Sequence, residues 1–549
     1  MLSFRRSTAL PLVAALSLVL AGCSSETDNG ESNGGEPIDG GTLTFATGDA
    51  EPTCLDPHVG GNMPQQIAGI HVTESLFTMT EEGEIEPWLA ESGEMSEDGM
   101  TWTFTLKEDV EFTDGTPFDA EAVKANVEHL QDPATESSTG YLALEHVESV
   151  EPVGAHTAVF HMTEPDAALM ESFAQTWLAM QSPTAMERGM EENCESPVGT
   201  GPFIVSEWSK QHSITYTRNE NYNSAPATAD HEGPAYLETL EIRFMPDATS
   251  RYAALQAGEV DVIDSAQPDT ISQARASDGP IKDLLGVRSG ASTRLELNTG
   301  GNTFSDPLVR QAFMHASDIE TGVETLFFGT VERSTSMVAS STPHGTSHDD
   351  GAFDCDQEIA NELLDEAGWE MGEDGIRTKD GERLTVRIPV STHQSIPAEQ
   401  SLIEQIQAQS REVGFDVTID PMDLASWYAA AGAWEFDAIT APYGKSSPDV
   451  MRIIFHSDGI EPAPSGYHAN NINVRNDELD ALLEQANQTT DEAERADLYA
   501  QAQQIIVDGA YVMPLYDWQT RVLYSEDVQG LRLETNLSTP WFADAWINE

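Results

Sequence analysis

The residues that could do chemistry form few catalytic patterns in this sequence. There is no GxSxG nucleophile turn, no HExxH zinc helix and no GxxxxGK[ST] phosphate loop. Gly199-Thr200-Gly201 lacks the third glycine of a dinucleotide-binding loop. His344 and His348 precede Asp349 and Asp350, but the surrounding Pro, Gly, Ser and Thr are typical of a surface loop, so no metal site is predicted. The sequence therefore favours a binding protein over an enzyme, because a secreted hydrolase would need a nucleophile and a base.

The N-terminus has the pattern of a secretory signal peptide. Two arginines precede an apolar run from Ala9 to Ala21, which is shorter than the roughly 20 residues that span a bilayer. The run ends in Leu20-Ala21-Gly22-Cys23, which resembles a bacterial lipobox. Residues 1–22 are therefore predicted to be removed, and 23–40 to form a lipidated Cys23 with a flexible tether. We expect an extracytoplasmic protein, anchored to the outer face of the cell membrane by the lipid on Cys23.

Three cysteines follow the tether, at Cys54, Cys194 and Cys355. Outside the cell two of them are expected to form a disulfide and to leave one thiol, but the spacing does not show which two pair. Zinc is not predicted, because no CxxC pair or Cys/His cluster is present.

The charge of the chain is strongly negative. It has 26 basic and 94 acidic residues, and a formal net charge of −68. A nucleic-acid partner is not expected, because a phosphate backbone would be repelled. The acids favour solubility in a salty exterior, where charge is screened. Disorder is not implied, because 39% of the residues are hydrophobic.

The residues after the tether are more than one hydrophobic core usually supports, so two or three lobes are expected. Apolar residues alternate with polar ones in Trp102–Leu106 and Leu240–Phe244, which predicts half-buried strands. Asp306 and Pro307 have the types of an N-cap and a first helical residue. A long helical region is predicted from Leu479 to Ile506. The pattern indicates an α/β or α+β protein with several lobes.

Several motifs carry a resemblance to a known family. Trp102–Lys107 followed by Val110–Ala120 resembles the signature of extracellular solute-binding proteins of family 5, the class that includes dipeptide-, oligopeptide- and nickel-binding proteins. Other matching motifs occur in the family's order over nearly the whole mature chain. They are Gly40–Phe45, Leu55–Pro57, Pro197–Phe203, Asn219–Tyr222, Ala254–Asp261, Val309–Ala312, Leu363–Trp369 and Met513–Tyr516.

The resemblance implies an α/β fold of the periplasmic-binding-protein-like type II class. Two large lobes would surround a ligand cleft, and a third lobe would be inserted. Lobe I would comprise residues 41–85, 198–292 and 519–549, lobe II residues 86–197, and lobe III residues 293–518. Closure of lobes I and III about a hinge would bury the ligand.

The resemblance also implies the function. The chain would be the substrate-binding lipoprotein of an ABC importer, a monomer without a cofactor. It would capture a small polar solute, in the first place a short peptide, and deliver it to the permease subunits. A nickel chelate, an opine or a sugar remains an alternative cargo, and a sensing role without transport remains open.

A loop at Ala441–Asp449 is the counterpart of a ligand-binding loop in peptide-binding relatives, where an acidic side chain pairs with the α-amine of the peptide. Here Lys445 or Ser446 takes the place of that acid, and Asp449 lies close by. A buried Lys445 would favour an anionic ligand group, whereas Asp449 could still bind an α-ammonium.

Other ligand contacts are expected around this loop. Trp427 and Tyr443, together with Trp434, are predicted to form an aromatic wall. The resemblance places His58 in the first lobe facing the cleft, and Arg333 near the hinge of lobe III. Further candidates are the loop from Met337 to Pro343, Asp517 and Trp518.

Overall fold

The computed structural model describes residues 36–80, 83–277, 279–348, 351–392, 395–441, 443–445 and 447–548. The predicted signal peptide, Cys23, most of the tether and Ser446 lie outside the described residues. In the described part of the chain, no helix has the length and apolar composition needed to cross a membrane.

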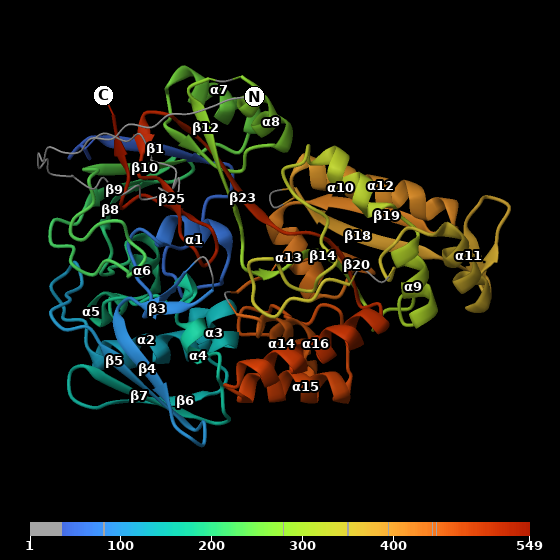
Figure 1. Cartoon of the computed structure of the whole chain (residues 1–549), viewed down its shortest axis with the longest axis horizontal. Helices are drawn as coiled ribbons and strands as arrows, with labels where there is room; N and C mark the ends of the chain where they lie inside the picture. The colour runs from blue at the N-terminus through green and yellow to red at the C-terminus, as the bar shows by residue number, and fades with distance from the viewer. Residues whose placement is uncertain are drawn as a thin grey trace, which may run out of the picture. The chain divides into compact units, whose positions relative to one another are not determined.

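Lobe I is built on a seven-stranded sheet in the order β12-β23-β11-β1-β10-β9-β8 (Figure 1). Strand β1 (Thr42–Thr47) lies inside the sheet and pairs in parallel with β10 (Thr239–Phe244) on one side and β11 (Val262–Ile263) on the other. The predicted strand at Leu240–Phe244 is confirmed as β10, with Leu240 and Ile242 buried. The other main elements of lobe I are α1 (Met63–Gly69), β2 (Phe77–Met79), β3 (Ile85–Pro87), β8 (Phe203–Ser209), β9 (Ser213–Arg218), α7 (Ala248–Ala257), α8 (Pro268–Ala276), β12 (Ile281–Val287) and β23 (Gln519–Ser525).

Lobe II contains a four-stranded antiparallel sheet in the order β4-β5-β7-β6. The predicted strand at Trp102–Leu106 is confirmed as β5 (Thr101–Leu106), which buries every second side chain. Residues of lobes I and II share one hydrophobic core, which draws on residues 43–262 and 522–545. The other elements of lobe II are β4 (Ala90–Met95), α2 (Ala120–Gln131), α3 (Thr139–Ala143), β6 (Val147–Pro152), β7 (Thr157–Met162), α4 (Leu169–Ser172), α5 (Pro183–Met186) and α6 (Met190–Glu195).

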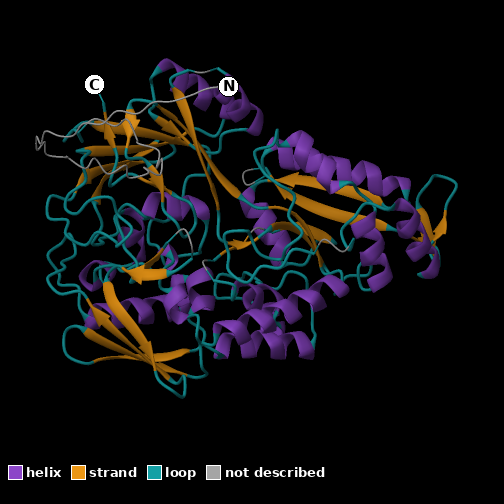
Figure 2. Ribbon diagram, viewed as in Figure 1, coloured by secondary structure: helices purple, strands orange, loops and turns teal. Residues whose placement is uncertain are grey.

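Lobe III has its own core, drawn from residues 291–516. Its strands form a sheet in the order β20-β14-β22 and a parallel pair of β18 with β19, and α10 and α12 lie along that pair (Figure 2). Strand β13 (Gly290–Ala291) lies just before the predicted start of this lobe and pairs with β21. The elements of lobe III are β14 (Thr293–Leu297), α9 (Pro307–His315), α10 (Ile319–Leu326), α11 (Gln357–Glu366), β15 (Glu370–Met371), β16 (Arg377–Lys379), β17 (Glu382–Arg383), β18 (Thr385–Ser391), α12 (Pro397–Glu412), β19 (Asp416–Met422), α13 (Leu424–Gly432), β20 (Ala438–Thr440), β21 (Tyr443–Gly444), α14 (Val450–Phe455), α15 (Asp477–Gln488), α16 (Glu492–Asp508) and β22 (Val512–Tyr516).

Helix caps follow the sequence patterns in lobe III. Helix α9 begins as predicted, because the Asp306 carboxylate accepts a hydrogen bond from Leu308 N. The predicted long helical region is instead two helices, α15 and α16. They separate because the Asp491 side chain accepts hydrogen bonds from Ala493 N and Glu494 N and so starts a new helix.

Two neighbouring segments connect lobes I and III. Strands β12 and β23 pair along their whole length, from Ile281 opposite Ser525 to Val287 opposite Gln519. Just beyond this ladder, Arg288 N donates to Trp518 O over 2.9 Å. The connection is therefore a hydrogen-bonded pair of strands, a suitable place for a hinge.

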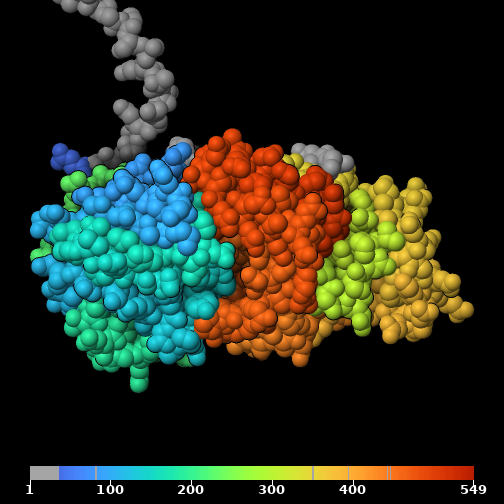
Figure 3. Space-filling view, turned by 90° about the horizontal axis from the view of Figure 1, so that it is seen from below, coloured from blue at the N-terminus to red at the C-terminus, as the bar shows by residue number. Residues whose placement is uncertain are grey.

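Lobes II and III also contact each other directly (Figure 3). The Arg495 guanidinium binds both carboxylate oxygens of Glu171, over 2.8 and 3.0 Å. A second ion pair joins Arg452 of lobe III to Glu145 of lobe II. Both arginine side chains are buried, whereas the two glutamates remain partly exposed, so these pairs lie at the edge of the packed interface.

Candidate functional site

A pocket with a volume of about 350 Å³ lies where segments of all three lobes meet. Small-ligand sites are typically roughly 300–1,000 Å³, so its size suits a small solute. The lining residues are Gly60, Gly61, Asn62 and Met63 of lobe I, Ser138, Thr139 and Trp177 of lobe II, and Trp427, Tyr428, Gly432, Ala441, Tyr443, Gly444, Ser465, Gly466, Tyr467 and Trp518 of lobe III.

The local fold fixes the aromatic side chains of this pocket. Trp427 and Tyr428 lie on α13, whose N-cap Asp423 accepts a hydrogen bond from Ser426 N. Tyr443 lies on β21, opposite Ala291 of β13. This close pairing requires Gly290, because its φ of +126° is in the region that favours glycine and a Cβ there would lie 2.2 Å from Tyr443 O.

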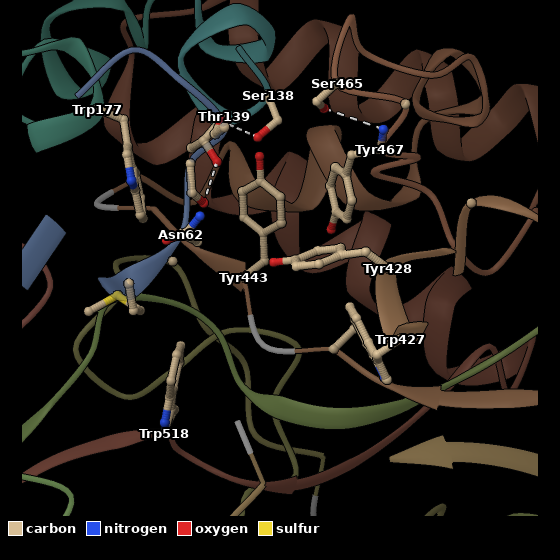
Figure 4. Close-up of a pocket in the computed structure, with 17 residues that line it drawn as sticks. Asn62, Ser138, Thr139, Trp177, Trp427, Tyr428, Tyr443, Ser465, Tyr467 and Trp518 are labelled. Carbon is tan, nitrogen blue, oxygen red and sulfur yellow. Dashed lines mark hydrogen bonds between the residues drawn. The ribbon is translucent and has the colours of Figure 1, made fainter. Parts of the chain in front are cut away.

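Six aromatic side chains line the pocket. Tyr443 lies between the others, and its hydroxyl is directed toward Ser138 (Figure 4). The rings of Trp427 and Tyr428 meet edge to face, with their centroids 5.1 Å apart. Trp518 has the guanidinium of Arg288 over its ring at 4.0 Å, so a cation–π contact holds this indole in place.

Uncharged polar groups lie between the rings. Ser138 donates a hydrogen bond to Gly60 O, and Thr139 donates to Gly61 O over 3.4 Å, which joins lobe II to lobe I at the pocket wall. The indole N–H groups of Trp177 and Trp427 are buried and have no hydrogen-bond partner within the described part of the chain. Both tryptophans belong to the pocket lining.

None of the described lining residues is acidic, basic or a histidine. Burial raises the pKa of the Tyr443 hydroxyl above its usual range, and burial likewise raises that of Tyr467, so both phenols are neutral. Among the described residues of the lining, no nucleophile is paired with a base and no set of metal ligands is present. A small pocket lined by aromatic rings and uncharged polar groups is typical of sites that bind small solutes.

The predicted charged residues form a separate network beneath the pocket wall. Lys445 Nζ donates to Asp449 Oδ2 over 2.8 Å, and both side chains are only 1% exposed. Arg452 Nε donates to Asp449 Oδ1 over 2.7 Å, and Arg452 also pairs with Glu145 of lobe II. Lys445, Asp449, Arg452 and Glu145 thus form a chain of alternating charge, which we call the interlobe charge chain.

The interlobe charge chain determines the protonation of its acids. Burial alone would raise the pKa of Asp449, but Arg452 and Lys445 outweigh it and hold the pKa well below its usual value. Burial and the nearby Asp449 carboxylate raise the pKa of Asp166. Asp449 is therefore an ionised side chain whose charge is already balanced by two cations of lobe III.

His58 also belongs to a buried network outside the pocket lining. Its Nε2 donates to Ala179 O over 2.8 Å, and burial lowers its pKa to about 4, so the ring is neutral. Asp56 accepts from His129 Nε2 over 2.9 Å, and the ligand atoms of Asp56, His58 and His129 lie within 4.8 Å of one another. This group could hold a metal ion only by giving up hydrogen bonds, because Asp56 also accepts from Gln181 and Asn193.

Arg333 lines a second, polar cavity of about 1070 Å³. Its guanidinium donates to Leu515 O over 3.2 Å and to two other main-chain carbonyls, so it holds the loop against β22. Asp517 and Gln519 line this cavity, whereas Trp518 between them lines the first pocket. Successive residues of an extended strand point to opposite sides, which explains the separation.

The structure thus brings together Trp427, Tyr443 and Trp518 at the first pocket, but not the other predicted contacts. Trp434 stacks on Phe436 in a small satellite core. The pocket lining also includes Trp177, Tyr428 and Tyr467, which were not predicted as site residues from the sequence. Tyr428 could have been found by its place next to Trp427, whereas no local pattern marks Trp177, which comes from lobe II.

The cysteines complete the covalent frame around the site. Cys54 of lobe I and Cys194 of lobe II form a disulfide, and Cys355 is free and exposed. The prediction of one disulfide and one remaining thiol is confirmed. The bond closes a loop of 140 residues and ties the two lobes that share a core.

Comparison with known proteins identifies the class. Residues 84–459 match the family described as bacterial extracellular solute-binding proteins, family 5. The nickel-binding periplasmic protein of Escherichia coli is 28% identical over 479 residues, which cover 84% of this chain and 86% of that protein. In Helicobacter pylori, the ABC transporter-associated periplasmic binding protein DppA, solved with the peptide STSA, matches with a TM-score of 0.80 at 23% identity and covers 93% of this chain and 99% of its own. Brucella suis NikA, solved with Fe(III)-EDTA, matches with a TM-score of 0.78 at 27% identity, over 92% of this chain and all of its own.

The chain belongs to the extracellular solute-binding proteins of family 5. The predicted fold class, a type II periplasmic-binding-protein-like fold with a third inserted lobe, is confirmed by these structures. Its matched relatives are solute-binding proteins rather than enzymes, and they work outside the cytoplasm with ABC transporters.

Proposed function

We propose that this chain is the lipid-anchored substrate-binding subunit of an ABC importer, and that it captures a small polar solute in the aromatic pocket. One observation carries the proposal: lobes I, II and III all contribute lining residues. Separation of the lobes would open such a pocket, and closure would bury its contents.

Binding and delivery then follow from two conformations. A solute that touches all three lobes binds more tightly to the closed form than to the open form, so it shifts the population toward closure. The permease subunits would recognise the closed form. A lipid on Cys23 would keep the monomer close to the permease, with the tether allowing it to reach.

A short peptide is one candidate cargo, because the Helicobacter pylori relative was solved with the peptide STSA. The Brucella suis relative was solved with Fe(III)-EDTA, so similar folds accommodate very different solutes. The cargo of this chain therefore depends on its own pocket lining.

A thermal-shift screen of the mature chain without its lipid tests the binding role. The panel contains dipeptides, saccharides, quaternary amines and nickel chelates. A true ligand at about 100 times its Kd should stabilise the protein by roughly 2.7 kcal/mol. The same ligand should reduce the radius of gyration measured by X-ray scattering. Failure of every compound to shift the melting temperature would contradict the proposed function.

The anchor is tested separately in cells. Wild-type protein should remain with the membrane fraction and incorporate labelled fatty acid. Cys23→Ser should appear in the soluble extracytoplasmic fraction without label, whereas Cys355→Ser should behave as wild type. Equal labelling of the Cys23→Ser variant would contradict the predicted lipidation.

A further inference from the structure

The pocket lining indicates a chemical class of solute, an inference that rests on the proposed function of the same pocket. The described lining contains no charged side chain, although 22% of the residues in the chain are charged. Such a lining gives no counter-charge to an ionic ligand group. A buried ammonium or carboxylate without a partner costs several kcal/mol, so this pocket disfavours solutes that carry one.

Two cations lie next to lining residues without lining the pocket themselves. Lys445 follows the lining residue Gly444, but its ammonium is buried against Asp449 at 2.8 Å. Arg288 lies over the ring of Trp518 at 4.0 Å, and its Nε donates to Thr520 Oγ1 over 2.8 Å. The Lys445 ammonium is therefore not presented to the solute as a free charge, and Arg288 lies outside the lining, although its buried Nη1 has no hydrogen-bond partner within the described residues.

The lining combines aromatic faces with neutral hydrogen-bonding groups. Trp427, Tyr428 and Trp518 offer ring surface, and Asn62, Ser138 and Thr139 offer an amide and two hydroxyls (Figure 4). A sugar ring has the matching character, because its C–H faces pack on aromatic rings while its hydroxyls need hydrogen-bond partners around the rim.

We propose that the solute is a neutral saccharide of one or a few rings. A free dipeptide would place an ammonium and a carboxylate in an uncharged lining. A quaternary ammonium such as choline would use the aromatic faces but not the amide and hydroxyl groups. An anionic metal chelate would lack a cation.

The test is calorimetric titration of the mature chain with maltose, cellobiose and xylobiose, and with Met-Leu and choline as the alternatives. At least one saccharide should bind, with an affinity that changes by less than about twofold between low and high NaCl, because no ionic contact is screened. Tyr428→Ala should weaken that saccharide about three- to tenfold. Tyr428 is 38% exposed, so this variant should fold.

Two variants separate the pocket from general effects. Tyr252→Ala removes a tyrosine on α7, outside the lining, and should leave affinity unchanged. Trp427→Phe retains an aromatic ring but removes the indole N–H. This variant should remain folded, as judged by its thermal unfolding curve, and should bind the saccharide more weakly. If neither Tyr428→Ala nor Trp427→Phe changes the affinity for the saccharide, the sugar binds outside this pocket and the inference is overturned.

The remaining outcomes distinguish the two proposals. Binding of Met-Leu or choline with no response to any saccharide would overturn the saccharide inference and leave the importer function standing. No response to any of the five probes, together with a silent thermal-shift screen, would overturn both.

Discussion

Replacement of Asp449 by asparagine should destabilise the ligand-free protein by about 3–5 kcal/mol, the typical cost of breaking a buried ion pair. Asp449 is 1% exposed and binds Lys445 Nζ over 2.8 Å and Arg452 Nε over 2.7 Å. The neutral amide would leave the Lys445 ammonium, which is equally buried, without its carboxylate.

The size of the loss can be divided between the two cations. Arg452 keeps its pair with Glu145, so its share should be the smaller one. Lys445 should account for most of the effect, and the double variant Lys445→Met, Asp449→Asn should recover part of the lost stability. Such recovery is expected because removal of both members of a buried pair is often far less costly than removal of one.

Urea unfolding at fixed salt, followed by tryptophan fluorescence, measures these free energies. Asp420→Asn is the matched control, because Asp420 pairs with Arg387 over 2.6 Å on the surface, where both side chains are more than a third exposed. It should cost only about 0–1 kcal/mol. If the free energy of unfolding of Asp449→Asn lies within about 0.5 kcal/mol of that of the parent protein, the interlobe charge chain does not stabilise the fold. A lost peptide affinity at unchanged stability would instead support Asp449 as a ligand contact.

Three further predictions follow from the buried groups. Burial lowers the pKa of His71 from about 6.5 to about 3, so the folded protein keeps this ring neutral at a pH where the unfolded chain protonates it. The stability that depends on the neutral ring is therefore fully present above pH 6.5 and is lost as the pH falls toward 3. His71→Leu should flatten this part of the stability–pH curve by about 1.4 kcal/mol per pH unit, and an unchanged slope in pH-dependent urea unfolding would contradict the assignment. Loss of the disulfide in a Cys54→Ser, Cys194→Ser variant should lower the free energy of unfolding by about 4–5 kcal/mol, whereas reductant should then have no further effect. Glu171→Gln should raise the rate of solute release tenfold or more in stopped-flow fluorescence, because Arg495 loses its carboxylate across lobes II and III; an unchanged rate would show that this pair does not hold the closed form.

Local patterns were sufficient to predict the individual elements of the fold. Alternation in Trp102–Leu106 and the cap at Asp306 depend on neighbouring residues only, and both are confirmed. The break between α15 and α16 was missed, although residues 487–492 contain no apolar side chain and Asp491 is a typical N-cap residue. The order of the lobes came from the family resemblance, since no local pattern specifies which distant segments pair.

For the same reason, only part of the candidate site could be predicted from the sequence. Tyr443 belongs to the loop Ala441–Asp449 and Trp427 is close to it in sequence, and both line the pocket. Trp177 reaches it only through the packing of lobe II, which sequence spacing does not encode. Lys445 and Asp449 lie in the turn that leads into α14, where they pair with each other rather than lining the pocket, and sequence spacing outside a helix does not predict such a pair.

The loop Ala441–Asp449 contributes residues both to the pocket lining and to the interlobe charge chain, and this would link closure to specificity. Ala441, Tyr443 and Gly444 face the pocket, while Lys445 and Asp449 face away and connect through Arg452 to Glu145 of lobe II. Contact between lobes II and III therefore fixes the loop and keeps its charges away from the solute. In a chain with a net charge of −68, an ionic ligand would experience a strong and salt-dependent field. A neutral solute in an uncharged pocket would bind with nearly the same affinity whatever the salt outside.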